Sequence, residues 1–251
     1  DVMTLTENGL ADYGKVAKIA ADGDSLTFEP APKTSALPEV LTTPDQPFQE
    51  NGGLKVLDGK LGRAVIKISA VAPEHRLIEA PAKVFTDQNQ IQAAFKAGEL
   101  HGDFIAVLRS QGPKANGMPE LHKLTPPLSV LQKLGFKVAL VTDGRTSGKV
   151  PAAIHLTPEA VDGGPIAKVR DGDMIRLDAE SGKLDILVDA AEFDARDVAT
   201  DDMSQSHVLM GRELFGSFRT TVGDSETGAG VFGVPSLTVV EESDVEKVVV
   251  G

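Results

Sequence analysis

The chain has 251 residues, of which 41% are hydrophobic and 25% are charged, a composition typical of a folded protein with a substantial core. Its formal net charge of −12 argues against binding to nucleic acid or to an anionic membrane, although a few local cations can still bind a small anion. The absence of cysteine excludes disulfides, thiol catalysis and any iron–sulfur site built by this chain alone.

The first fifty residues differ in character from the rest. They begin without Met and have neither the basic start nor the apolar region of a signal peptide, so we expect a fragment or processed piece of a cytoplasmic protein. Residues 11–20 could form a short helix, whereas five prolines between residues 29 and 48 block both helix and central strand. We interpret residues 1–50 as a connector arm and residues 51–251 as a separate domain.

The middle of the chain alternates short strands with helices. Runs of β-branched and apolar residues, bounded by Gly, Pro and Asp, predict strands at 63–69, 82–86, 103–110 and 136–144. Helical spacing of apolar residues predicts one helix between 86 and 100, capped by Thr86 or Asp87. A second helix is expected at 126–135, ended by Gly135.

The last hundred residues continue the strand-rich pattern. Thr157 as N-cap and Pro158 at the first helical position predict a short helix that ends at Gly163-Gly164. Strands are expected at 165–169, 173–178 and 183–189, a helix at 206–218, and β-like segments at 235–251. About eight short strands with few helices do not fit a doubly wound sheet. We predict a mixed, β-rich fold, either a barrel or a sandwich with flanking short helices.

Two polar loops, each following a predicted strand, are the candidate functional features. The loop at 109–127 presents Lys114, Asn116, Glu120, His122 and Lys123, and the loop after residue 142 presents Asp143, Arg145, Ser147, Lys149 and His155. Each could be a plain surface connection, the second of them an Asp-Gly turn. Alternatively, Glu120 could bind a hard cation such as Mg²⁺, and the Ser147 hydroxyl could take a proton if a nearby cation lowered its pKa.

Several long motifs resemble one enzyme family. The stretches "QGPKANGMPELHKLTPP", "KVALVTDGR", "KVPAAIH" and "DGGPIAKVRDGDMIR" resemble the C-terminal domain of the dihydroxy-acid and 6-phosphogluconate dehydratases. The 6-phosphogluconate branch is the most similar, through "ANGMPELHK", "KVLDGKLGRAVIKISAV", "IEAPAKVF" and "GRELF". The similarity covers roughly residues 45 to 220.

The resemblance implies a fold, a reaction and cofactors. The fold would be a β-barrel of the swivelling-domain type, packed on an N-terminal domain that carries the cysteines of an iron–sulfur cluster. The reaction would dehydrate 6-phosphogluconate to a 2-keto acid, the first step specific to the Entner–Doudoroff route, with Mg²⁺ or a similar divalent cation shared between the domains. The family is usually dimeric, and this chain alone would be inactive.

The same resemblance implies roles for two residues. Glu120 matches a magnesium ligand, and Ser147 matches the serine that acts as a base on the C2 proton. The family usually reads Gly-Arg-x-Ser-Gly-Ala-Ser-Gly-Lys-Val-Pro, so about three residues are missing here after Ser147. A gap placed before Thr146 would instead make Ser147 the second serine of that motif.

Charge and location, not the family, suggest further candidates for binding the carboxylate and phosphate of a substrate. These candidates are Lys114, Asn116, His122, Lys123, Arg145, Lys149 and His155. Two alternative functions stay open at this point. One is the same fold acting on another dihydroxy or sugar acid, and the other is a barrel without chemistry that serves as a scaffold or dimerisation module.

Overall fold

The computed structural model describes residues 9–50, 52–148 and 150–232, and the chain divides into two compact units, Asp1–Gly52 and Gly53–Gly251. The first unit contains a short 3₁₀ helix, Gly9–Gly14, and an antiparallel hairpin of β1 (Lys15–Ile19) and β2 (Leu26–Pro30). The helix expected at 11–20 is therefore largely wrong. The turn explains why, because the Asp22 carboxylate accepts the backbone N–H of Ser25 and reverses the chain.

The hairpin has one apolar face. Antiparallel partners share a face of the sheet, so Ile19 lies beside Leu26 and Ala17 beside Phe28. These side chains stay open to solvent, with Ile19 at 74%, Leu26 at 61% and Phe28 at 64% of full exposure. On the opposite face, Lys18 forms an ion pair with Glu29 at 2.5 Å.

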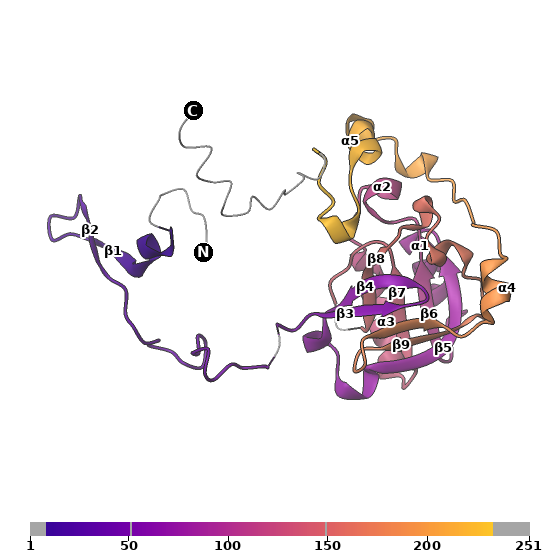
Figure 1. Ribbon diagram of the computed structural model, residues 1–251, viewed down its shortest axis with the longest axis horizontal. Helices are drawn as coiled ribbons and strands as arrows, with labels where there is room; N and C mark the ends of the chain where they lie inside the picture. Colours follow the sequence, from indigo (N-terminus) through magenta and orange to yellow (C-terminus); the bar gives the residue numbers. More distant parts are fainter. Residues whose placement is uncertain (1–8, 51, 149, 233–251) are drawn as a thin grey trace, which may run out of the picture. The chain divides into compact units, whose positions relative to one another are not determined.

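The second unit is a closed barrel of eight strands, which confirms the β-barrel prediction (Figure 1). Around the barrel the order is β10-β3-β4-β8-β7-β6-β5-β9, in which β5, β6, β7 and β8 run parallel. The strands are β3 (Lys55–Gly59), β4 (Gly62–Ile66), β5 (Leu77–Phe85), β6 (Phe104–Leu108), β7 (Val138–Thr142), β8 (Ala152–Thr157), β9 (Met174–Asp178) and β10 (Lys183–Ile186).

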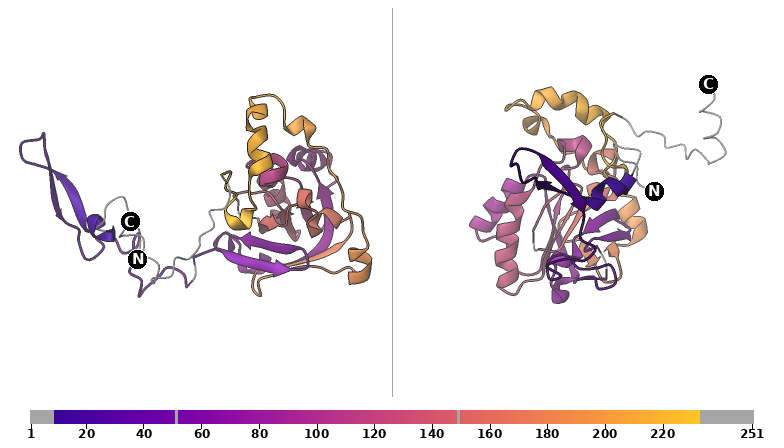
Figure 2. Two further views of the ribbon diagram at one scale, coloured as in Figure 1. Left: turned by 45° about the horizontal axis from the view of Figure 1, so that its top comes forward. Right: turned by 90° about the vertical axis from the view of Figure 1, so that its left-hand side faces the viewer.

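Two hydrophobic cores bury both faces of the central parallel strands. In β6, Ile105 and Val107 point into the core inside the barrel, whereas Phe104, Ala106 and Leu108 belong to a second core outside it. The helices α1 (Gln88–Lys96) and α3 (Thr125–Lys133) pack on this outer face (Figure 2). Strands covered on both sides carry continuous apolar runs instead of alternating ones, which is how β6 and β7 appear in the sequence.

Helix boundaries follow local capping chemistry. Asp87, one of the two caps expected from the sequence, caps α1, and Gln90 completes a capping box. The remaining helices are α2 (Pro113–Asn116), α4 (Ala190–Asp194) and α5 (Gly216–Thr221), and α5 lies beside α2 at one end of the barrel (Figure 1). Among the described residues, no helix is long and apolar enough to cross a membrane.

Three expectations for the second half of the chain need correction. Residues 165–169 form a 3₁₀ helix, Pro165–Lys168, instead of a strand, because Pro165 favours a helical start. Thr157 completes β8, so the short helix begins only at Ala160, although it ends at Gly163 as expected. The helix expected at 206–218 is interrupted by positive φ angles from residue 209 to 211, and α5 starts at Gly216. Residues 235–251 lie outside the described part.

Strands β3 and β10 pair in parallel and close the barrel. This seam is the shortest strand pairing around the barrel. One residue pair, Asp58 with Lys183, defines its register, and the Asp58 N–H donates to the carbonyl of Gly182 at 2.9 Å. A Cβ at Gly59 would collide with the Leu184 carbonyl, so the close approach of the two backbones requires glycine there.

Replacing Gly59 with alanine should therefore open this seam. Overpacking of this kind costs about 2 kcal/mol of unfolding free energy, measured by urea denaturation of the 251-residue chain. Gly52→Ala is the matched control, because no atom lies within 4 Å of an added Cβ at Gly52. Equal stability of the two variants would contradict this role for the seam.

Candidate active site

The candidate site lies at the end of the barrel where the parallel strands finish. Strands β5, β6, β7 and β8 have their carboxyl ends at this edge, and polar loops follow each of them. Ligand sites of parallel sheets lie at the carboxyl ends of the strands, because loops from neighbouring strands converge there. Both loops singled out in the sequence, one after β6 and one after β7, leave from this edge.

Asp143, the first residue after β7, connects these loops. Its carboxylate is fully buried and accepts the backbone N–H groups of Ser110 at 3.0 Å, Gln111 at 2.9 Å and Ala160 at 3.0 Å. Burial raises the pKa of this carboxyl, and the three N–H donors oppose the rise. The adjacent Gly144 is required by packing, since a Cβ there would lie 2.7 Å from the Cβ of Gln111. Asp143 therefore fixes the loops after β6, β7 and β8 to one another.

Glu120 and Ser147 meet at the ends of two of these loops. The Ser147 backbone N–H donates to Glu120 Oε1 at 3.0 Å, and the Ser147 hydroxyl lies 3.5 Å from the same oxygen. Arg145 Nη1 pairs with the other oxygen, Glu120 Oε2, at 2.6 Å. A backbone bridge joins Glu120 to Arg145 as well, and the Leu121 N–H donates to the Arg145 carbonyl at 3.1 Å.

This cluster is partly open to solvent. The Glu120 side chain is 31% exposed, the Arg145 side chain is 47% exposed, and Ser147 is exposed. Thr125 Oγ1 donates to the Ser147 carbonyl at 3.1 Å and holds the backbone of this turn against α3. The carboxylate, guanidinium and hydroxyl therefore face a common region in which a polar ligand could contact all three.

Three of the other residues named from the sequence lie near the cluster or line a cavity. Asn116 and Lys123 line a cavity, where Asn116 Nδ2 donates to Gln111 Oε1 at 3.0 Å and Lys123 Nζ to Asn89 Oδ1 at 3.0 Å. His155 is half-buried beside the cluster, and burial, followed by the charge of Arg145, lowers its pKa.

The remaining candidates are Lys114, His122 and Lys149. Lys114 is held by Asp162 and Asp224, each at 2.6 Å, and these two hydrogen bonds raise its pKa. That ammonium is already neutralised by two carboxylates, which favours a structural ion pair. His122 is exposed next to the cavity-lining Lys123, and Lys149 lies outside the described residues.

Sequence reasoning missed Glu159, a second buried carboxylate behind this end of the barrel. Its oxygens accept the backbone N–H groups of Lys114 at 3.1 Å and of Ala115 at 3.2 Å, so it satisfies the start of α2. Burial raises its pKa to about 7, with a further contribution from the charge of Asp143. In the sequence, Glu159 follows Thr157-Pro158 and carries no signal that separates it from an exposed glutamate.

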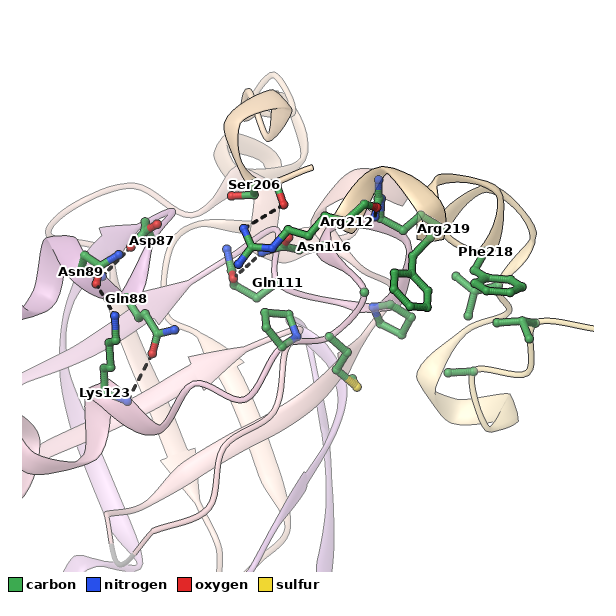
Figure 3. Close-up of a pocket in the computed structure, with 18 residues that line it drawn as sticks. Asp87, Gln88, Asn89, Gln111, Asn116, Lys123, Ser206, Arg212, Phe218 and Arg219 are labelled. Atoms are coloured by element: carbon green, nitrogen blue, oxygen red, sulfur yellow. Dashed lines mark hydrogen bonds between the residues drawn. The ribbon is translucent and has the colours of Figure 1, made fainter. Parts of the chain in front are cut away.

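A cavity of about 570 Å³ lies at this end of the barrel. Figure 3 shows the side chains that line it. Residues of α1, α2, α5 and nearby loops line it, and its wall carries Lys123, Arg212 and Arg219 as cations. Met118 and Pro119 form another part of the wall, and Glu120 follows them directly in the chain. The sequence analysis did not select Arg212 or Arg219, although Arg212 lies in the "GRELF" motif.

Residues 39–229 match the family described as dihydroxy-acid/6-phosphogluconate dehydratase C-terminal, and the chain belongs to that family. The family resemblance drawn from the sequence is thereby confirmed.

Several curated relatives share one particular name. The chain is 56% identical over 234 residues to the phosphogluconate dehydratase of Rhizobium meliloti (strain 1021), an alignment that covers 92% of this chain and 38% of the relative. It is 51% identical over 232 residues to the phosphogluconate dehydratase of Escherichia coli (strain K12), covering 91% of the chain and 38% of the relative. A dihydroxy-acid dehydratase from Nitratidesulfovibrio vulgaris (strain DSM 19637 / Miyazaki F) is 38% identical, covering 76% of the chain and 35% of that protein. The chain thus spans well under half the length of these relatives.

The burial of Glu159 generates a prediction about pH. Its folded-state pKa of about 7 lies above its ordinary value of 4.5, so between these values the folded chain binds more protons than the unfolded chain. The contribution of Glu159 to stability therefore falls as pH rises through this window, by about 3 kcal/mol in total. Glu159→Gln stays neutral and should become more stable relative to the parent chain between about pH 5 and about pH 8.

Urea denaturation at about pH 5 and about pH 8 measures the difference in unfolding free energy between the parent chain and Glu159→Gln. Glu99→Gln, which removes an exposed carboxylate, is the control for the loss of one surface charge. A difference between parent and Glu159→Gln that does not change with pH would show that Glu159 does not titrate in this window.

Proposed function

We propose that the chain is the C-terminal domain of a hydro-lyase that converts 6-phospho-D-gluconate to 2-dehydro-3-deoxy-6-phosphogluconate in the Entner–Doudoroff pathway. The observation that carries the proposal is the meeting of Glu120 and Ser147, with Ser147 N–H bound to Glu120 Oε1, in a chain about half identical to phosphogluconate dehydratases. The reaction balances without an oxidant. The C2–H bond breaks, the C3 hydroxyl leaves as water, and the resulting enol becomes the 2-keto acid.

The proposal assigns the rest of the active site to an N-terminal domain. Relatives extend well beyond the region that this chain matches, which supports a further domain. The chain has no cysteine, so an iron–sulfur cluster would be held by the other domain. No group of three or more potential ligand residues that could hold a metal ion occurs among the described residues.

Glu120 fits one position of such a shared site. Mg²⁺ in enzymes often takes only one or two protein carboxylates and completes its shell with water and substrate oxygens. The Glu120 side chain is partly exposed. At close range Oε2 bonds to Arg145 and Oε1 to the Ser147 N–H, which leaves lone pairs for a cation. When bound, the cation would make the C2 proton more acidic, and the cluster would act as a Lewis acid on the departing hydroxyl.

Ser147 takes the C2 proton in this proposal. A hydroxyl is a poor base near neutral pH, so its environment must stabilise the alkoxide. Arg145 supplies positive charge beside the Glu120 carboxylate, and the hydrogen bond from the Ser147 N–H to Glu120 fixes the serine backbone. Arg145 and His155 also lie where they could bind the substrate carboxylate, as positioning residues.

The remaining parts of the proposal concern assembly and location. We propose a homodimer, by analogy with the family. We propose a cytoplasmic location because a phosphorylated sugar acid carries several charges and does not cross a membrane unaided.

A substrate of the dihydroxy-acid type is the second candidate, supported by the 38% identity to a dihydroxy-acid dehydratase. Comparing turnover of 6-phosphogluconate with that of a branched-chain dihydroxy acid separates the two. A protein with neither activity would be the non-catalytic scaffold.

Ser147→Ala in the full-length protein should lower kcat for 6-phosphogluconate by about 100-fold or more, since a positioned base contributes that much to proton transfer. The assay is formation of the 2-keto acid. Ser69→Ala is the matched control, because Ser69 is an exposed serine after β4, which is antiparallel to β8 and ends at the opposite edge of the barrel. Full activity of Ser147→Ala would show that another residue is the base.

A further inference from the structure

We infer that Arg212 and Arg219 form the subsite for the phosphate group at the far end of the substrate, with Lys123 across the cavity. This inference deepens the proposed function and rests on it for the identity of the substrate. The sequence analysis assigned the phosphate to other cations, in the two polar loops. The structure instead points to a segment near the end of the described chain, residues 204–231, that folds over one side of the cavity.

The two arginines lack the carboxylate partners that most arginines in the described part of the chain have. Arg212 Nη1 donates to the Ser206 carbonyl at 3.2 Å, and Arg219 Nη1 donates to the Arg212 carbonyl at 3.2 Å. Neither forms an ion pair with a carboxylate in the described part of the chain, whereas Arg109 is paired with Asp201 and Arg176 with Glu79.

The overall charge makes this arrangement informative. The chain has 37 acidic residues for 25 lysines and arginines, so carboxylates are available to pair with most cations. Two arginines bonded only to neutral carbonyls can direct their remaining N–H groups at an anionic ligand. Guanidinium groups bind phosphate oxygens through two parallel N–H bonds, which makes arginine well suited to a phosphate dianion.

The rest of the cavity fits a ligand that is polar at its ends. Figure 3 shows the Arg212 side chain reaching from its segment toward Asn116 and Gln111, with Lys123 on the far side beside Asn89. Pro113, Phe215 and Phe218 supply apolar surface, which lowers the local dielectric and strengthens attraction to an anion. The volume of about 570 Å³ is within the range of small-molecule sites.

One carboxylate also lines the cavity and must be taken into account. Asp87 is the N-cap of α1, and its Oδ1 accepts the Asn89 N–H at 2.5 Å. Its charge is thus directed to the start of that helix, on the side of the cavity where Lys123 Nζ bonds to Asn89. The arginines lie on the other side, on the segment that includes α5 (Figure 3).

The chain links the wall of the cavity directly to the Glu120–Ser147 cluster. Met118 and Pro119 line the cavity, Glu120 is the next residue, and Arg145 Nε donates to the Met118 carbonyl at 3.0 Å. A linear sugar acid could therefore have its carboxylate end at the cluster and its phosphate in the cavity. This arrangement makes Arg212 and Arg219 the residues that select a phosphorylated substrate.

The test compares two substrates in the full-length protein. Arg212→Gln and Arg219→Gln, alone and combined, are assayed with 6-phosphogluconate and with gluconate, which lacks the phosphate. Charge-assisted hydrogen bonds predict a loss of about 100-fold in kcat/KM for 6-phosphogluconate in the double variant. The loss should appear mainly in KM, and kcat/KM for gluconate should fall by no more than about threefold.

Arg170→Gln is the matched control, because Arg170 is exposed and lines a different surface hollow. Binding of inorganic phosphate, measured by calorimetry, gives a readout that does not depend on turnover, and it should weaken in the double variant but not in Arg170→Gln. Equal losses with both substrates and unchanged phosphate binding would overturn the inference and indicate that this surface contacts another domain. A parent protein that binds phosphate through these arginines but does not dehydrate 6-phosphogluconate would refute the proposed function alone.

Discussion

Three backbone N–H groups donate to the buried carboxylate of Asp143, and the loops that carry Glu120 and Ser147 both start beside it. A carboxylate without a cation partner is costly to bury, so each of these bonds is needed to compensate for its lost hydration. Glu159 repeats the arrangement for the start of α2. The site is therefore held by buried acids bonded to backbone, and the side chains proposed for chemistry remain free to face a ligand.

This arrangement separates cations that support the fold from cations that can bind. Lys114 is fixed between two carboxylates, and Arg109 is paired with Asp201 on a nearly buried surface. Arg145 is intermediate, since it pairs with the same Glu120 that is proposed to bind a metal ion. Arg212 and Arg219 are bonded only to carbonyls. These two arginines combine a place in the cavity wall with the absence of a carboxylate partner in the described part of the chain, and this combination marks them as candidates for binding.

The parts of the fold that the sequence predicts are those set by local chemistry or by burial on both faces. The uninterrupted apolar runs of β6 and β7 and the Asp87 cap of α1 are of this kind. The hairpin, β3 and β8 were not recognised, because their short and partly polar segments are strands only through pairing with distant partners. The same limit applies to the site. Glu120 and Ser147 follow strands and could be selected, whereas Glu159 and Arg219 gain their surroundings only when remote segments fold together.

The hairpin of β1 and β2 has a practical consequence for work with this part of the protein. Among residues 9–50, the described part of its own unit, no second layer of structure covers Ile19, Leu26 and Phe28, and a two-stranded ribbon is marginally stable by itself in water. Its outer edges also offer free backbone groups to any passing strand. We therefore expect a preparation of the barrel that keeps residues 9–31 to self-associate through this exposed apolar hairpin. A chain that begins near Gly53 lacks the hairpin and keeps every strand of the barrel.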